Sequence, residues 1–247
     1  MLASHTFHRD NLASLWGSCL PETKRSEKPA NSRCLRADIV APNATSHASK
    51  LEPGVGALCR VASKTRAPTM DGVITPDTKN WTWVLDRPCV ECGFDASTCP
   101  PERVAGLARE NAMTWERLRR DGKIRAGRPD ESTWSTLEYA CHVRDVYRRY
   151  GIRIGLMLKE NDPLFENWDQ DASAIADGYE QQAPHVVVAE LLAAAKALAS
   201  QLDGVSGTTW NRPGRRSDGA SFTVGTISRY MIHDTIHHVW DVTKQHH

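Results

Sequence analysis

After Pro100, apolar residues recur every three or four positions in four separate segments. This spacing places them on one face of an α-helix. The segments are about 104–118, 136–158, 184–202 and 224–242. No convincing stretch alternates apolar and polar residues, as a half-buried β-strand would. We therefore predict an all-α fold class in which the four helices pack into one bundle.

Residues that typically start or stop helices flank these segments. Ser135-Thr136-Leu137-Glu138 has the sequence of a capping box at the start of the second helix. Pro184 begins the third helix and Gly204 ends it. The intervening segments are expected to be a polar connection over 160–183 with one helical turn at 172–179, and a Gly/Arg/Ser-rich loop over 205–222.

The first 69 residues differ from the rest of the chain. They hold ten Lys and Arg but only five Asp and Glu, and their aromatic residues are Phe7 and Trp16. Their apolar residues follow neither a helical nor a strand period, so we expect a disordered extension. The composition changes at Met70. This favours translation that starts at Met70, with residues 1–69 wrongly included in the sequence, over an organelle transit peptide. The domain organisation we predict is 1–69 as this extension, 70–99 as an irregular lead-in with a Cys-x-x-Cys pair, and 100–247 as the bundle.

Charge and composition argue against several classes of protein. Lys and Arg total 31 against 30 Asp and Glu, and residues 70–247 carry 21 basic and 25 acidic groups, a net charge of −4. A nucleic-acid-binding or membrane-surface protein would be more basic. The sequence contains no run of 18 apolar residues, so we predict no membrane-spanning helix. The seven cysteines are odd in number and mostly scattered, which argues against a disulfide framework. We therefore expect a protein of the reducing cytoplasm.

Three histidines stand at positions that favour a metal site. His233 and His237 are four residues apart, so both imidazoles project from one face of the last helix. His142 lies in a partly apolar stretch of the second helix and is expected to face inward. Three imidazoles suit a divalent transition metal with a coordination position left open. His238 is expected outside this set. Spacing alone leaves open that these histidines are solvated or are satisfied core residues.

Carboxylates accompany these histidines. Metal-bound imidazoles usually donate their second N–H to a carboxylate or a carbonyl, which fixes the orientation of the ring. The candidates for this supporting role are Asp145, Asp234 and Asp241.

Three stretches of this chain resemble the DinB-like metalloenzymes, the superfamily that includes mycothiol-dependent maleylpyruvate isomerases. They are Tyr139–Val146, Arg216–Thr223 and Tyr230–Val242. The resemblance implies a four-helix, up-up-down-down bundle and a divalent metal, such as zinc, nickel or iron, held by three histidines. Matched by position, these ligands are His142, His233 and His237.

The resemblance also suggests an activity. Relatives in this family transfer low-molecular-weight thiols such as bacillithiol or mycothiol, or isomerise maleylpyruvate with a thiol cofactor. We therefore expect a thiol-dependent S-transferase or a related hydrolase that activates a thiol or water and acts on a small molecule. The alternative is a non-catalytic bundle that binds a small ligand or forms a homodimer, with a structural metal.

Cysteines offer a second candidate site. Cys89 and Cys92 have the spacing of a zinc knuckle, and Cys99 follows seven residues later. Three interpretations remain: a metal site completed by a residue from elsewhere, a redox pair, or a turn packed against the bundle. Cys141, beside a candidate metal ligand, is expected to be a small core residue.

A basic group precedes the last helix at Arg212, Arg215 and Arg216. Arg215 or Arg216 could receive an anionic group of the substrate or of a thiol cofactor. Solvated loop charges are the commoner explanation for such a group.

Overall fold

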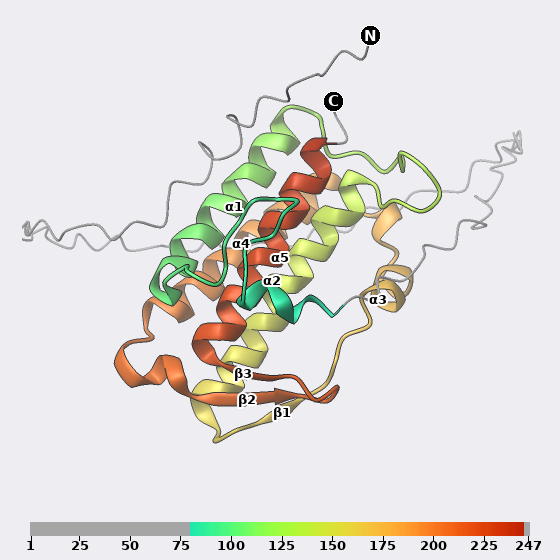
Figure 1. The fold of residues 1–247 in the computed structure, drawn as a ribbon. Helices are drawn as coiled ribbons and strands as arrows, with labels where there is room; N and C mark the ends of the chain where they lie inside the picture. The colour runs from blue at the N-terminus through green and yellow to red at the C-terminus, as the bar shows by residue number, and fades with distance from the viewer. Residues whose placement is uncertain (1–79, 245–247) are drawn as a thin grey trace, which may run out of the picture. The chain divides into compact units, whose positions relative to one another are not determined.

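The computed structural model describes residues 80–244, and Figure 1 shows their arrangement. Four long helices form a bundle: α1 (Val104–Arg120), α2 (Thr136–Lys159), α4 (Pro184–Asp203) and α5 (Val224–Lys244). The short α3 (Gln170–Ala176) lies between α2 and α4, where one helical turn was predicted. Short 3-10 helices occur at Trp81–Leu85, Pro101–Arg103, Tyr179–Gln181 and Gly207–Asn211. The predicted four-helix bundle is confirmed, whereas the predicted extension at 1–69 and the start at Met70 lie outside the described residues.

The capping box predicted at the start of α2 is present. Ser135 Oγ accepts a hydrogen bond from the Glu138 amide at 3.2 Å, and Glu138 accepts one from the Ser135 amide at 2.8 Å. Arg128 donates to both carboxylate oxygens of Glu138, whose side chain is almost fully buried. The start of α2 is therefore fixed by local hydrogen bonds and by an ion pair from the preceding loop.

The helices are arranged so that α1 and α2 each pack mainly against α4 and α5. Arg109, near the start of α1, is ion-paired with Asp203 at the end of α4, so these two helices are antiparallel. Arg212, just before α5, donates a 2.6 Å hydrogen bond to the carbonyl of Met157 near the end of α2, so α2 and α5 are antiparallel as well. The order of directions is thus up-down-down-up (Figure 1), and not the expected up-up-down-down.

The two connections explain this order. The segment 121–135 turns back at the end of α1, because the amide of Leu137 donates to the carbonyl of Arg125 and holds the start of α2 there. The segment 160–183 instead returns along the bundle and brings Gln182 to Arg144, near the start of α2, at 2.6 Å. As a result α4 starts near the same end as α2 and runs parallel to it.

Large buried side chains fill the space between the helices, among them Trp115, Tyr147, Ile154, Leu191, Leu198 and Met231. A buried polar chain joins three helices inside this core. Tyr147 donates to the side chain of Asn111, and Asn111 donates to the carbonyl of Thr235, each at 2.8 Å. These bonds satisfy the buried polar groups and fix α5 against α1 and α2.

Among the described helices, α4 alone is long and apolar enough to match a membrane span by length and composition. The sequence had predicted no span. In the structure, the buried side chains of α4, including Val188, Leu191 and Leu198, belong to the core shared with α1 and α2. An apolar helix of this kind is what the centre of a bundle requires.

The structure also contains a small sheet that the sequence did not predict. Its strands are β1 (Leu164–Phe165), β2 (Pro213–Arg216) and β3 (Ser221–Thr223). β1 pairs with β2 in parallel, and β2 pairs with β3 in antiparallel fashion. Strands of two to four residues are too short to show an alternating pattern, so the segments were predicted as a connection and a loop.

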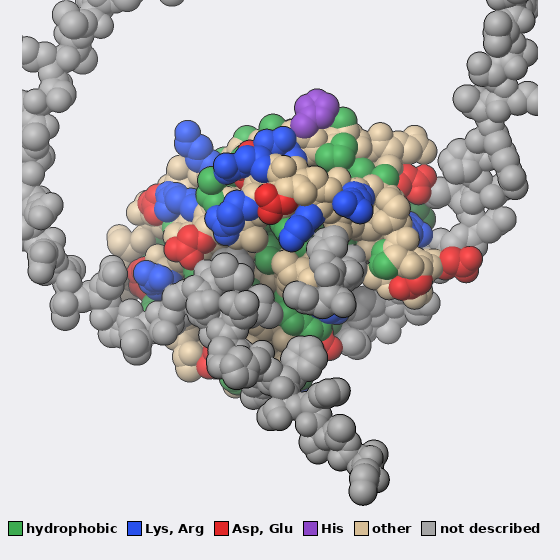
Figure 2. Space-filling view, turned by 90° about the horizontal axis from the view of Figure 1, so that it is seen from above, with side chains coloured by type: hydrophobic (Ala, Val, Ile, Leu, Met, Phe, Trp, Pro, Cys, Tyr) green, Lys and Arg blue, Asp and Glu red, His purple; other side chains and the backbone are tan. Residues whose placement is uncertain are grey.

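Figure 2 shows one face of the molecule. Lys and Arg side chains share this face with Asp and Glu side chains and with apolar ones. The Lys and Arg side chains gather over the upper part of this face, with Asp and Glu side chains between and beside them. The absence of nucleic-acid binding stays a prediction from net charge.

Candidate functional site

A cleft of about 980 Å³ lies along one side of α5. Its walls come from the lead-in at Trp81, from α2, from the connection before α3, from β2 and from α5 itself. Residues that line it include Trp134, Arg153, Trp168, Arg216, Asp234 and His238. Aromatic side chains line it together with many polar and charged ones, so a concave site of this size suits a polar small molecule.

Three side chains from α2 and α5 meet beside this cleft, and we refer to His142, Asp234 and His238 as the triad. Their candidate ligand atoms lie within 4.8 Å of one another. Asp234 Oδ1 is 3.5 Å from His142 Nε2 and 2.9 Å from His238 Nε2. The triad therefore brings two imidazoles to one carboxylate oxygen.

Packing fixes the His142 ring. The ring is fully buried and stacks on Trp168 with an interplanar angle of 8° and a centroid distance of 5.0 Å. Trp134 contacts it from another side at 5.3 Å between centroids. Neither ring nitrogen of His142 has a hydrogen-bond partner among the described residues. Buried polar atoms are normally paired, so these nitrogens are suited to a ligand that the protein chain does not supply.

Electrostatics within the triad favour a negative Asp234 between basic groups. Burial lowers the pKa of His142. Burial acts in the same direction on His238, but the carboxylates of Asp234 and Asp241 outweigh it and raise its pKa to about 9. Burial would raise the pKa of Asp234, yet the two facing imidazoles hold it far below its usual value. One carboxylate and two imidazoles form a donor set that fits a divalent transition metal.

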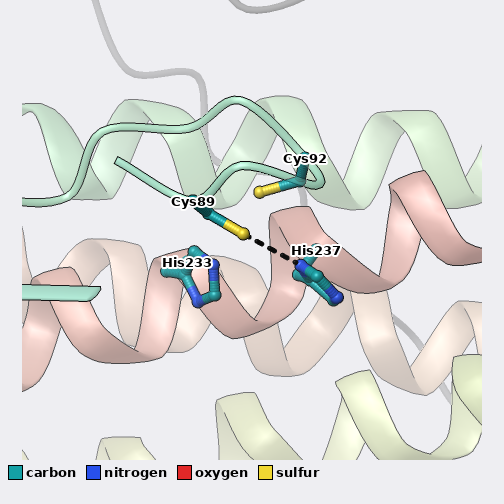
Figure 3. Close-up of side chains that lie close together, drawn as sticks. All are labelled: Cys89, Cys92, His233 and His237. Carbon is teal, nitrogen blue, oxygen red and sulfur yellow. Dashed lines mark hydrogen bonds between the residues drawn. The ribbon is translucent and has the colours of Figure 1, made fainter. Parts of the chain in front are cut away.

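The other two predicted ligands lie in a different group. His233 and His237 come together with Cys89 and Cys92 of the lead-in, again with all candidate ligand atoms within 4.8 Å, and Figure 3 shows this arrangement. We refer to Cys89, Cys92, His233 and His237 as the tetrad. The three histidines expected to share one ion thus lie in two groups, and His142 is joined by Asp234 and His238 instead.

Helix geometry explains the division. Successive residues on an α-helix point about 100° apart, so the pair 233 and 237 and the pair 234 and 238 form adjacent stripes on α5. α2 packs against the stripe of Asp234 and His238, and the lead-in covers the stripe of His233 and His237. Both pairs have the same spacing, which is why sequence alone could not distinguish them.

The three supporting carboxylates proposed from sequence have different partners. Asp241 Oδ2 lies 3.0 Å from His238 Nδ1 and 3.8 Å from His237 Nε2. Asp234 belongs to the triad itself. Asp145 instead pairs with Arg144 and Arg148 and accepts a hydrogen bond from Tyr179 at 2.7 Å. Asp145 therefore stabilises the junction between α2 and the segment before α4.

The basic residues divide similarly. Arg215 is more than half exposed, pairs with Asp162, and does not line the cleft. Arg216 lines the cleft, pairs with Asp218, and lies over the ring of Tyr230 at 5.7 Å. Sequence analysis missed Arg153 of α2, which is buried, lines the cleft and donates to the backbone carbonyl of Glu166. The sequence offered one sign of this: Arg153 lies among the apolar residues on the buried face of α2, such as Tyr150, Ile154 and Met157.

The other cysteines among residues 80–244, Cys99 and Cys141, lie outside the tetrad. Cys99 is buried, and its sulfur is 3.6 Å from the carbonyl of Pro100. Cys141 is fully buried, with its sulfur 3.8 Å from the carbonyl of Tyr179, and burial raises the pKa of its thiol to about 12. A neutral buried thiol of this kind acts as a small core residue.

Comparisons with known proteins agree with this fold. The family model described as the DinB superfamily matches residues 102–242. A solved structure titled "YfiT from Bacillus subtilis is a probable metal-dependent hydrolase with an unusual four-helix bundle topology" is similar, with a TM-score of 0.52 and 16% sequence identity. The similarity covers 59% of this chain and 87% of that one. No curated protein matches the chain significantly.

Proposed function

The chain belongs to the DinB superfamily, and we propose that it is a metal-dependent enzyme whose divalent ion is held by His142, Asp234 and His238. The observation that carries the proposal is that the imidazole of His142 is buried with unpaired ring nitrogens. This fully buried imidazole has no hydrogen-bond partner for either nitrogen among the described residues, yet it faces a carboxylate and a second imidazole. A metal ion would satisfy the nitrogen that faces Asp234.

The position of the triad supports catalysis rather than a purely structural role. The side chains of Asp234 and His238 are 25% and 18% exposed, and both line the cleft. A structural metal is normally enclosed by four protein ligands, whereas a three-ligand set beside a cleft leaves room for a substrate. A divalent ion here, such as zinc, nickel or iron, would act as a Lewis acid and lower the pKa of a thiol or water that reaches it.

Residues around the triad would hold the reacting groups. Asp241 accepts from His238 and orients its ring, while Trp134 and Trp168 hold His142 in place. Arg153 and Arg216 add positive charge in the same cleft, and neither cationic group is fully exposed. This pair would bind the carboxylate or another anionic group of a substrate or thiol.

The reaction class we propose is S-transfer from a low-molecular-weight thiol, of which mycothiol is one example, with hydrolysis of a small molecule as the close alternative. The cationic groups of Arg153 and Arg216 favour an anionic group on the thiol or on the substrate. Mycothiol has no carboxylate, so with mycothiol this anionic group would belong to the substrate. Arg153 and Arg216 would position the molecule that carries the anionic group, and the aromatic wall would exclude water from the sulfur of the thiol.

The test is a metal-dependent conjugation assay. Full-length protein loaded with zinc, nickel or iron is incubated with monochlorobimane and a panel of cellular thiols, and in parallel with ester and amide substrates. Turnover should require metal and should be lost in His142→Ala and His238→Ala. His185→Ala is the matched control, because His185 is exposed at the start of α4 and should retain full activity.

The competing candidate is a non-catalytic bundle with a structural metal. It would bind metal at the triad but show no turnover with any thiol or ester. It would also admit no exogenous ligand such as azide or a thiol to the ion. That pair of results would move the conclusion to the structural role.

A further inference from the structure

We infer that Cys89, Cys92, His233 and His237 form a second, structural metal site for zinc, separate from the triad. The tetrad joins a turn in the lead-in to the middle of α5, 141 positions later in the sequence, counted from Cys92 to His233. Figure 3 shows the two sulfur atoms and the two imidazoles directed toward one another.

The donor set matches zinc. Two thiolates and two imidazoles are a common set for structural zinc, which is almost always tetrahedral in such sites. With Zn–S near 2.3 Å and Zn–N near 2.0–2.1 Å, the ligand atoms of a tetrahedral site lie about 3.3–3.8 Å apart. The sulfur of Cys89 is 3.6 Å from His237 Nδ1, and all four candidate atoms lie within 4.8 Å of one another. Only a small contraction would be needed.

The turn that carries the cysteines is already shaped for this role. The Cys89 amide donates to the carbonyl of Phe94, and the Gly93 amide donates to the carbonyl of Cys89. Gly93 has φ +75°, a conformation that side chains rarely adopt. These features reverse the chain within five residues and place both sulfurs on the side that faces α5.

The two histidines are held in ligating orientations. His237 Nε2 lies 3.2 Å from a Glu91 carboxylate oxygen, which leaves Nδ1 facing the cysteine sulfur. A carboxylate at the second imidazole nitrogen is a common feature of zinc-bound histidine. His233 is almost fully buried, and its Nε2 has no hydrogen-bond partner among the described residues. This unpaired nitrogen is an independent sign that a ligand belongs there.

The site would fasten the lead-in over the bundle. Trp81 packs on the rings of both His233 and His237, at centroid distances of 5.9 and 5.3 Å. Trp81 also lines the cleft, so a zinc ion in the tetrad would fix one of its walls. Binding would release the two thiol protons to solvent and would couple metal affinity to folding of the lead-in.

The test counts and identifies metal in the full chain. Wild-type protein should bind two zinc ions. The double variant Cys89→Ser/Cys92→Ser should lose one and keep the other, whereas His142→Ala/His238→Ala should keep the tetrad ion. Cys141→Ala is the matched control and should keep both. Because the two double variants empty different sites, failure of the tetrad and failure of the triad give different results.

Cobalt supplies a readout that does not depend on a variant folding. Wild-type protein loaded with Co²⁺ should show a sulfur-to-cobalt charge-transfer band and the intense visible bands of a tetrahedral ion. The band should persist in His142→Ala/His238→Ala. Absence of that band in the wild type would overturn the inference. A Cys89–Cys92 disulfide, found after cellular thiols are trapped by alkylation at lysis, would overturn it in favour of a redox pair.

Discussion

On α5, neighbouring side chains face different groups of ligands. His233 points to the cysteines of the lead-in, and Asp234 points to His142 on α2. The sequence supplies the i, i+4 spacing of both pairs but not the packing direction of the helix. The sequence therefore singled out His142, His233 and His237 and left His238 out, whereas the grouping in the structure depends on which side of α5 meets α2. That choice comes from tertiary packing, which one sequence does not reveal.

At this scale the supporting carboxylates make a direct prediction. Asp241→Asn should weaken metal affinity at the triad by about 10–100-fold, because the imidazole of His238 loses the carboxylate that orients it. Isothermal titration with zinc or cobalt measures this. Asp145→Asn is the matched control, since Asp145 contacts Arg144, Arg148 and Tyr179. An equal loss of affinity in Asp145→Asn would contradict the assignment.

Arg153 makes a second prediction. Arg153→Gln should raise the KM for a carboxylate-bearing thiol by about 10-fold or more, because the buried cation that lines the cleft is removed. The metal content should not change. Arg215→Gln should leave KM unchanged, since Arg215 is exposed and pairs with Asp162. If Arg215→Gln had the larger effect, the anionic group would bind at the exposed side of β2 and not in the cleft.

Among the elements, the four long helices could be predicted from the sequence, because the spacing of apolar residues and the residues that start or end a helix are local features. The capping box of α2 is an example: Ser135 and Glu138 fix the helix start through bonds only three residues apart. β2 and β3 lie close in sequence but are only four and three residues long, whereas β1 needed a partner about 50 residues away, as in the pairing of Leu164 with Arg215. No local pattern encodes such a pairing.

Glu138 gives a pH-dependent prediction for α2. Burial raises the pKa of Glu138, but hydrogen bonds from Arg128 and from the Ser135 amide outweigh it and leave the pKa below its usual value of 4.5. A carboxylate of lowered pKa stabilises the fold above its unfolded pKa, and this contribution is lost as the pH falls through the folded pKa. Glu138→Gln should therefore lower the free energy of unfolding by about 1–3 kcal/mol at neutral pH.

Urea unfolding at several pH values tests this effect. The difference between wild type and Glu138→Gln should shrink as the pH falls below 4.5. Glu116→Gln is the control, because Glu116 forms pairs on the helix surface with Arg119 and Arg120 and should change stability little. A Glu138 difference that stays constant down to acid pH would show that the ion pair does not stabilise the fold.

The contact between β2 and α2 gives a prediction for the sheet. A Cβ at Gly214 would lie 2.7 Å from Cγ of the buried Met157, so Gly214→Ala should destabilise the protein by about 1–3 kcal/mol. Thermal unfolding measures the loss. Gly127→Ala is the matched control, because a Cβ there meets no atom within 4 Å. Equal stability of the two variants would mean that Gly214 of β2 is not closely packed against Met157 of α2.

At the scale of the whole molecule, the up-down-down-up order determines where the site forms. It places α2 and α5 side by side and antiparallel, so His142 near the start of α2 faces Asp234 and His238 in the second half of α5. The same order brings the 160–183 connection back along α2, where Trp168 covers His142. Sequence predicted the bundle but not this order, because the direction of α2 depends on hydrogen bonds between segment 121–135 and the start of α2.

The most direct test of the central claim is an anomalous difference map from crystals of the full chain grown with zinc or cobalt. The account predicts a peak about 2.0–2.2 Å from ligand atoms of His142, Asp234 and His238. Any metal in the tetrad would give a second, separate peak. A single ion bound by His142 together with His233 and His237, or no peak at His142, would contradict the account.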